Sequence, residues 1–173
     1  MAGSVRLGQR GSITLGAIAL LVPLVVWQGC GRLRDKQAVR RYALATRAVE
    51  ARAGRVKTIG NDLHKIRSGL SSADLRRFLR ERYLPALQSL VDEIRRLPVQ
   101  MSRLGSIRSA LLSVAEQTLE VLENLADRSR GGLLEEAWQR VVQGQVALDA
   151  AVARHGEALD AICARHDLRR GGK

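Results

Sequence analysis

The sequence predicts an all-α protein, an antiparallel four-helix bundle that follows an N-terminal signal or anchor helix. After residue 29, the helix formers Ala, Leu, Arg, Glu and Gln greatly outnumber strand formers, and only four residues are aromatic. Apolar residues also recur at steps of three and four over four long segments, which places them along one face of each helix. Such faces satisfy one another by packing side by side.

An uncharged stretch near the N-terminus divides the chain into two parts. A leader with Arg6 and Arg10 and no acid precedes 17 uncharged residues that end at Gly29, which is the layout of an export signal. As a helix the stretch would be about 25 Å long, against a hydrocarbon core of about 30 Å, so it could also span a membrane. We therefore expect a signal peptide or signal anchor over residues 1–29 and a single helical domain over residues 30–173.

The end of this stretch, Val26-Trp27-Gln28-Gly29-Cys30, resembles the lipobox of bacterial lipoproteins. In that family a small residue precedes a cysteine that is diacylated and becomes the new N-terminus. Trp27 and Gln28 differ from the usual Leu and Ala or Ser. The resemblance implies lipid attachment at Cys30. Gly31 stands where an Asp would retain the protein in the inner membrane, so the resemblance implies a periplasm-facing protein of the outer membrane.

Two alternatives to the lipoprotein stay open. One is an uncleaved anchor that crosses the inner membrane once, and the other is an ordinary signal peptide cut at another position. Arg32, Arg34 and Lys36 follow the apolar stretch, and basic residues on that side favour keeping it in the cytoplasm.

The basic residues are unevenly distributed. Residues 30–97 contain 17 Lys and Arg against 7 Asp and Glu, a net charge of +10, whereas residues 98–173 contain 10 of each. The first half would be attracted to phospholipid or lipopolysaccharide headgroups, at about 1 kcal/mol per basic residue near the surface. The alternative is a set of solvated basic helix faces. Nucleic acid is disfavoured as a partner by the export signal and by the few aromatic residues available to stack on bases.

The first long helix is expected to begin near Arg34. Gly54 and Gly60 weaken it by about 1 kcal/mol each relative to Ala, and the segment 60–62 could kink it or end it. Its expected inner face consists of Val39, Tyr42, Thr46, Val49, Ala53, Val56, Gly60, Leu63, Arg67 and Leu70.

The second helix is expected after a turn at residues 68–72. Ser71 and Asp74 have the spacing of a capping box, with Asp in place of Glu. Pro85 lies inside the helix and lacks an N–H, so a bend or restart is expected there. Its expected apolar face consists of Leu75, Phe78, Leu79, Leu84, Leu87, Leu90, Val91, Ile94 and Leu97.

The third and fourth helices have the most regular spacing. We expect the third helix to end at a turn over residues 129–132 and the fourth to run from about Leu133 to Leu168. The third face consists of Leu104, Ile107, Leu111, Val114, Thr118, Val121 and Leu125, widened by Leu112, Leu119 and Leu122. The fourth consists of Leu134, Trp138, Val141, Gln145, Leu148, Val152, His155, Leu159, Ile162 and His166.

Two polar residues of the fourth helix, Gln145 and His155, occupy positions that otherwise face the core. Such residues can fix the register and pairing of helices. A second interpretation is pH sensing by His155, because histidine titrates near neutral pH.

Few residues suggest chemistry, and the chain is not expected to be an enzyme. It contains no Gly-rich phosphate loop, HExxH, CxxCH or GxSxG motif. Cys163 and His166, three residues apart on a helix, could offer a thiolate and an imidazole to one metal ion, with His64 as a speculative further ligand. The alternative is a buried cysteine and a hydrogen-bonded core histidine.

No cofactor is expected. A His near the end of the last helix resembles the haem ligation of b-type cytochromes with four helices, but their other ligand is a Met early in the first helix. This chain has only Met1 and Met101, so haem is not predicted.

These observations lead us to expect a membrane-tethered bacterial envelope lipoprotein that serves as a non-catalytic helical scaffold or interaction module with a protein partner. One alternative is a ligand- or metal-binding envelope sensor that uses the bundle interior. Another is a signal-anchored phage lysis protein, which is similar to inner-membrane spanins in having an anchor followed by a basic helical segment.

Overall fold

The protein is all-helical in the part that the computed structural model describes, namely residues 13–66, 69–127 and 134–168. Side chains are described from residue 31 onward within these ranges. The predicted all-α class is confirmed. The chain divides into two compact units, residues 1–37 and residues 38–173, each described by itself.

Helix α1 (Ile13–Lys65) is 53 residues long. The expected start near Arg34 was wrong, because the backbone is already helical from Ile13. Between Cys30 and Arg34 the only weak helix former is Gly31, and it does not end the helix. The leader and the side chains of the lipobox, Cys30 included, lie outside the described residues. The described residues contain no helical segment whose length and hydropathy would suffice to cross a membrane.

Within the second unit, residues 38–65 of α1 bury one face and continue through both glycines. One long helix through residues 60–62 was expected, with a break there as the alternative, and the helix indeed continues to Lys65. The buried positions follow the predicted three and four spacing, and Ile59 extends them. They are Val39, Tyr42, Thr46, Val49, Val56, Ile59 and Leu63, with Ala53 partly buried.

The next run of the chain contains α2 (Ser72–Phe78), the π-helical segment η2 (Leu79–Tyr83) and α3 (Leu84–Arg95). The predicted capping box is confirmed. The Ser71 hydroxyl oxygen accepts a hydrogen bond from the Asp74 N–H at 3.1 Å, and the Asp74 carboxylate accepts one from the Ser71 N–H at 3.3 Å. The hydrogen bonds from Ser71 lower the pKa of the Asp74 carboxyl group.

The predicted bend or restart at Pro85 takes the form of η2. The Leu84 N–H donates to the Leu79 carbonyl, five residues back, and α3 begins with Pro85 in its first turn. A proline ring clashes with the carbonyl four residues back in an α-helix, and the wider π turn relieves that crowding. Of the predicted apolar face, all residues are buried except Leu84, which is partly buried.

Helix α4 (Ser102–Asp127) corrects the predicted apolar face. Val121 was expected inside but is 42% exposed, and Ile107, Val114 and Leu125 are only partly buried. A straight helix has 3.6 residues per turn, so a strict seven-residue pattern drifts by about 20° per heptad. The buried face keeps the predicted Leu104, Leu111 and Thr118, includes Leu119 and Leu122, which were predicted to widen it, and adds Ala115 and Ala126, which the pattern missed.

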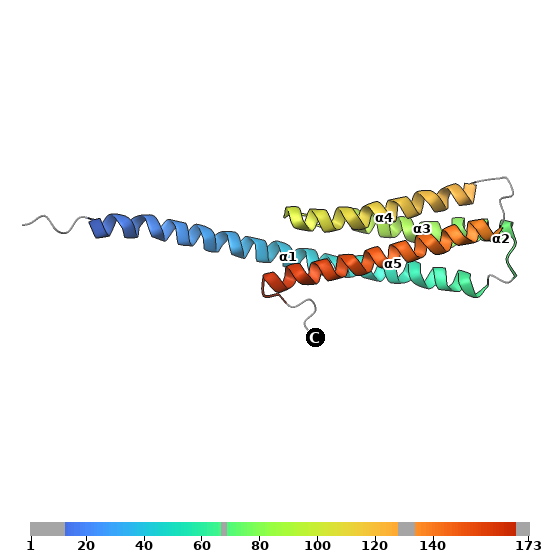
Figure 1. The fold of residues 1–173 in the computed structure, drawn as a ribbon, viewed down its shortest axis with the longest axis horizontal. Coiled ribbons are helices and arrows are strands. Elements are labelled where there is room, and N and C mark those ends of the chain that lie inside the picture. The colour runs from blue at the N-terminus through green and yellow to red at the C-terminus, as the bar shows by residue number, and fades with distance from the viewer. Residues whose placement is uncertain (1–12, 67–68, 128–133, 169–173) are drawn as a thin grey trace, which may run out of the picture. The chain divides into compact units, whose positions relative to one another are not determined.

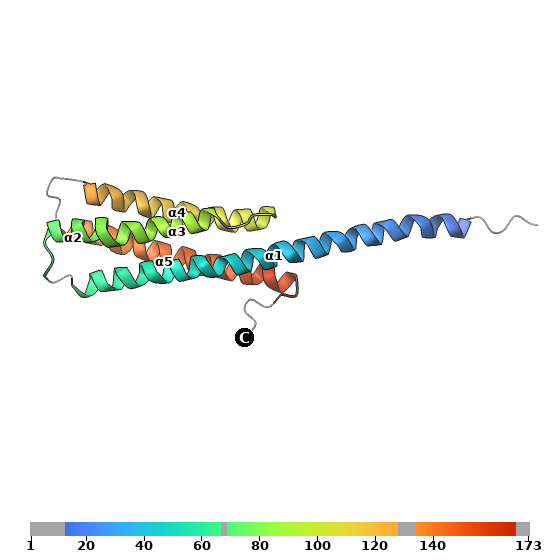
Figure 2. The same ribbon diagram turned by 180° about the vertical axis from the view of Figure 1, so that it is seen from behind.

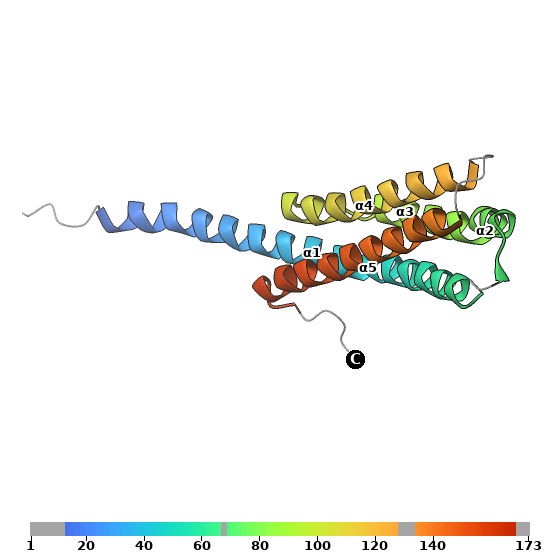
Figure 3. The ribbon, with the colours of Figure 1, turned by 45° about the vertical axis from the view of Figure 1, so that its right-hand side comes forward.

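Helix α5 (Leu134–Arg165) buries most of its predicted face and adds Ala151 and Cys163. The predicted turn over residues 129–132 lies outside the described residues. Helix α4 packs against both α3 and α5, and the core cluster draws on every helix of the second unit. There, residues 38–65 of α1 run along α3 and α5, and α4 lies on the far side of those two helices (Figure 1, Figure 2 and Figure 3).

Candidate functional site

A groove of about 510 Å³ with charged walls lies between α1 and the η2–α3 run. We call it the arginine groove. Arg52 and Arg55 enter it from α1 and Arg82 enters it from η2. All three side chains are exposed, and none of the three has an ion pair with another described residue. Its lining is completed by Thr58, Ile59, Asp62, Glu81, Pro85, Ala86 and Ser89.

The π segment determines which side chains reach this groove. Glu81 and Arg82 point outward and line it, whereas Tyr83 is fully buried. The Arg82 guanidinium lies 5.2 Å from the centre of the Phe78 ring, a cation–π contact that restricts its position. Pro85, which requires the wider turn, also lines the groove. The π segment that precedes Pro85 therefore shapes one wall of the groove.

Behind the groove, Tyr83 and Gln145 connect η2 to α5. The Tyr83 hydroxyl donates a hydrogen bond of 2.8 Å to Gln145 Oε1. Gly60 of α1 makes room for this contact, because a Cβ there would collide with Gln145 Oε1. Burial raises the pKa of the Tyr83 hydroxyl, and the Asp149 carboxylate raises it further. Gly60, which the sequence marks as a weak point of the helix, leaves the space that the Gln145 side-chain amide occupies.

His155, the other predicted polar position, is buried, with 5% exposure. Its Nε2 lies 3.0 Å from the Tyr42 hydroxyl of α1, and the two ring centroids are 5.9 Å apart. Burial raises the pKa of Tyr42, and the Arg108 guanidinium partly offsets this. Gln145 and His155 therefore each meet a tyrosine of another helix. Their proposed roles in register or pH sensing stay predictions.

The predicted metal pair lies at the C-terminal end of α5. Cys163 is buried, with 2% exposure, while His166 is partly exposed and follows the last helical residue, Arg165. The Cys163 carbonyl accepts hydrogen bonds from the N–H groups of His166 and Leu168, both at 3.0 Å. Asp167 has a φ of 52°, so this turn is a Schellman-type helix end. The helix ends at Arg165, earlier than the predicted Leu168, so Cys163 lies in its last turn and His166 directly after it.

The speculative third ligand, His64, lies far from that pair. His64 stacks on Trp138 with ring centroids 5.6 Å apart. Trp138 is 25 positions before Cys163 on the same helix, about 37 Å at 1.5 Å per residue. Within the described ranges, no three His, Cys, Asp or Glu residues are arranged to hold a metal ion. Metal binding at Cys163 and His166 stays a prediction, and no third ligand for it is found among the described residues.

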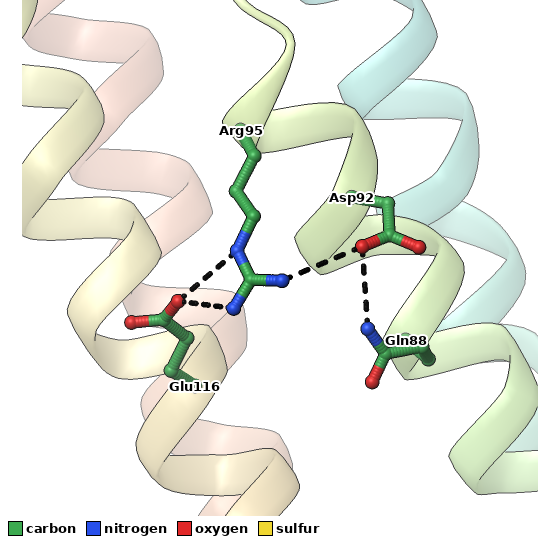
Figure 4. A network of polar contacts seen from close by, with 4 residues as sticks. All are labelled: Gln88, Asp92, Arg95 and Glu116. Carbon is green, nitrogen blue, oxygen red and sulfur yellow. Dashed lines mark hydrogen bonds and ion pairs between the residues drawn. The ribbon is translucent and has the colours of Figure 1, made fainter.

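A polar network between α3 and α4 shows how this chain neutralises an arginine. Arg95 contacts Glu116 of α4 at 2.7 Å and Asp92 at 3.6 Å, and Gln88 donates to Asp92 at 3.2 Å (Figure 4). These side chains are substantially exposed, so such a pair contributes at most about 1 kcal/mol. In contrast, the three arginines of the groove form no ion pair with another described residue.

A scan against protein-family models and searches of curated proteins and of solved structures found no match for this chain. Sequence reasoning missed the arginine groove. The predicted interruption at Pro85 marked the segment that forms one wall, because Pro85 and the nearby Arg82 both line the groove.

Proposed function

We propose that this protein is a lipid-anchored lipoprotein of the bacterial cell envelope whose helical domain acts as a non-catalytic interaction module. In this proposal, residues 1–29 are the export signal and Cys30 carries the lipid. The domain faces the periplasm from the outer membrane, and its helices form an antiparallel four-helix bundle. The basic residues of its first half contact an anionic lipid or lipopolysaccharide surface and assist binding of a protein partner.

The observation that carries the proposal is how the second unit presents its positive charge. Residues 38–65 of α1 bury their apolar face and expose the remaining surface. That surface is basic: Arg40, Arg41, Arg47, Arg52, Arg55, Lys57 and Lys65 are all exposed. Lys57 pairs with Asp149 at 3.5 Å and Lys65 with Asp62 at 3.4 Å. Most of the charge therefore remains available to an anionic partner.

The buried polar contacts support a rigid module. Tyr42 with His155, and Tyr83 with Gln145, join α5 to two other helices with directional hydrogen bonds. Buried polar pairs specify which helices meet, because a mismatch leaves a desolvated group without a partner. A domain held in one arrangement presents its basic surface in one geometry, which suits a scaffold.

The mature N-terminus tests the anchor and the compartment together. The full chain is expressed in a two-membrane bacterium, recovered from separated inner and outer membranes, and analysed by intact-mass spectrometry. We expect a diacylglyceryl mass on Cys30, lost in Cys30→Ala and retained in the matched control Cys163→Ala. An N-terminus at Met1, or cleavage at another position, would contradict the lipoprotein.

The interaction module is tested by chemical cross-linking in the same cells, followed by affinity capture of the tethered protein. We expect an envelope partner whose yield falls in a variant with Arg40, Arg41 and Arg47 changed to Gln. A partner retained at full yield would show that the basic surface is not used. Lysis on overexpression would favour the spanin-like alternative, and zinc retained after purification would favour the sensor.

A further inference from the structure

The arginine groove differs from the rest of the basic surface because three arginines from two elements converge on one concave surface. Elsewhere in the described residues, Arg95 meets Glu116 and Asp92, and Arg80 meets the Ala126 carbonyl at 2.6 Å and the Asp127 carboxylate at 3.4 Å. The three guanidiniums of the groove meet no carboxylate within ion-pair distance there. Unpaired arginines that converge on a concave surface attract an anion.

The positions of the arginines suit an oxyanion. Arg52 and Arg55 are three residues apart, so they lie on the same side of α1. Arg82 faces them from the other wall, where its contact with Phe78 limits its freedom. A planar guanidinium binds phosphate or carboxylate oxygens through paired N–H donors, and a partly fixed one loses less entropy on binding.

The remaining lining limits the charge and nature of the ligand. Asp62 and Glu81 bring the formal charge of the groove to +1 when set against the three arginines. This balance matches a group with one negative charge and disfavours polyphosphates. Ile59, Pro85 and Ala86 supply an apolar portion, and about 510 Å³ is the size of a small-molecule site. A phosphodiester joined to an apolar chain satisfies both conditions.

We propose that the arginine groove binds the phosphodiester of an anionic amphiphile, with the phosphate at Arg52, Arg55 and Arg82 and the apolar part against Ile59, Pro85 and Ala86. This proposal rests on the proposed function, since it assigns the attraction of the basic half to one defined site. The η2 segment is part of that site, in keeping with the frequent occurrence of π turns at functional sites. The chemistry can come from a membrane lipid or from a free phosphate ester.

The test is a titration of the full chain in neutral detergent, followed by native mass spectrometry. Four probes are used: phosphatidylglycerol, zwitterionic phosphatidylcholine, glycerol 3-phosphate without an apolar chain, and an acidic oligoglutamate peptide. The groove variant is Arg52→Gln with Arg55→Gln. The matched control is Arg103→Gln with Arg140→Gln, which removes the same charge from exposed positions of α4 and α5, outside the groove and outside the basic surface of α1. Circular dichroism checks that both variants stay helical.

We expect one phosphatidylglycerol bound at least tenfold more tightly than either phosphatidylcholine or glycerol 3-phosphate. The groove variant, and Arg82→Gln alone, should weaken binding tenfold or more, whereas the control should change it less than threefold. Equal affinity for glycerol 3-phosphate would identify a free phosphate ester as the source and overturn the role of the apolar residues.

Three results would overturn the site. Equal losses in the groove variant and the control would mean diffuse attraction, which leaves the proposed function intact. Tighter binding of the oligoglutamate than of phosphatidylglycerol would assign the groove to an acidic peptide instead. Absence of any phosphatidylglycerol adduct would remove the ligand altogether. A Cys30 that is not lipidated would contradict the proposed function without affecting any of these measurements.

Discussion

The contact between α4 and α5 and the space between α1 and the η2–α3 run show two ways in which this chain pairs helices. At the first, Gly144 of α5 comes so close to α4 that a Cβ would lie 3.0 Å from Thr118 Cγ2. At the second, arginines and a proline line an open groove. Small residues allow close packing, whereas long charged side chains and a π turn keep the surface accessible.

The charge of the two regions differs in the same way. The half of the sequence that contains α4 and α5 has balanced charge, and the half that contains α1 and the η2–α3 run carries the whole excess of the domain. Ion pairs join the halves at Arg95 with Glu116 and at Lys57 with Asp149. We infer that the α4–α5 region mainly provides stability and that the α1–η2 region is available for binding.

The largest expected effect concerns the stability of the α4–α5 region. Leu122→Ala removes a fully buried side chain and should lower the free energy of unfolding by about 2–5 kcal/mol. Val121→Ala, at the neighbouring exposed position that the heptad pattern placed inside, should cost less than about 1 kcal/mol. Urea denaturation of the full chain in neutral detergent, followed by circular dichroism, measures both. Equal losses of unfolding free energy in the two variants would mean that Val121 faces the core, as the sequence predicted.

The next effect concerns the hydrogen bond behind the groove. Tyr83→Phe removes the donor to Gln145 Oε1 and should cost about 0.5–1.5 kcal/mol of unfolding free energy. Tyr83→Phe combined with Gln145→Met removes both partners, so a smaller loss than with Tyr83→Phe alone is expected. If the two changes simply add in denaturation experiments, the hydrogen bond does not couple η2 to α5.

The buried tyrosines also predict a loss of stability at high pH. The pKa of Tyr42 in the folded protein is raised above its ordinary value of 10.0, so above pH 10 the unfolded chain loses a proton that the folded protein keeps. Each such tyrosine then lowers the free energy of unfolding by about 1.4 kcal/mol per pH unit, and its contribution is fully present below pH 10. Tyr42→Phe should make the decline between pH 10 and 12 shallower by that amount. Parallel curves would contradict the prediction.

Local signals in the sequence identified the ends and bends of helices well. Ser71 with Asp74 specified a cap, and Pro85 specified an interruption, because both effects depend on residues within one turn of each other. The face of α4 was less accurate, since a small error in periodicity accumulates until Val121 turns outward. The start of α1 was misjudged because no residue there stops a helix.

The candidate site could not be predicted in the same way. Arg52 and Arg55 are separated by about thirty residues from Arg82, and only the packing of η2 beside α1 brings them together. The partners of Gln145 and His155 likewise come from other helices. A sequence pattern showed that these two positions face inward, but it could not name Tyr83 and Tyr42 as the groups they meet.

The smallest effect compares a paired arginine with an unpaired one. Arg95→Gln removes the contacts to Glu116 and Asp92 and should lower the free energy of unfolding by up to about 1 kcal/mol at low salt, with the loss shrinking as salt screens the pair. Arg52→Gln breaks no ion pair with a described residue, so it should change stability by less than about 0.5 kcal/mol, or raise it at low salt by relieving repulsion among the basic residues of α1. Denaturation at about 20 mM and about 500 mM salt separates the two, because the Debye length is longer than about 10 Å at the first concentration and shorter at the second. A loss at Arg52 as large and as salt-sensitive as that at Arg95 would mean that Arg52 stabilises the fold, and the distinction between a stabilising and a binding region would fail at the groove itself.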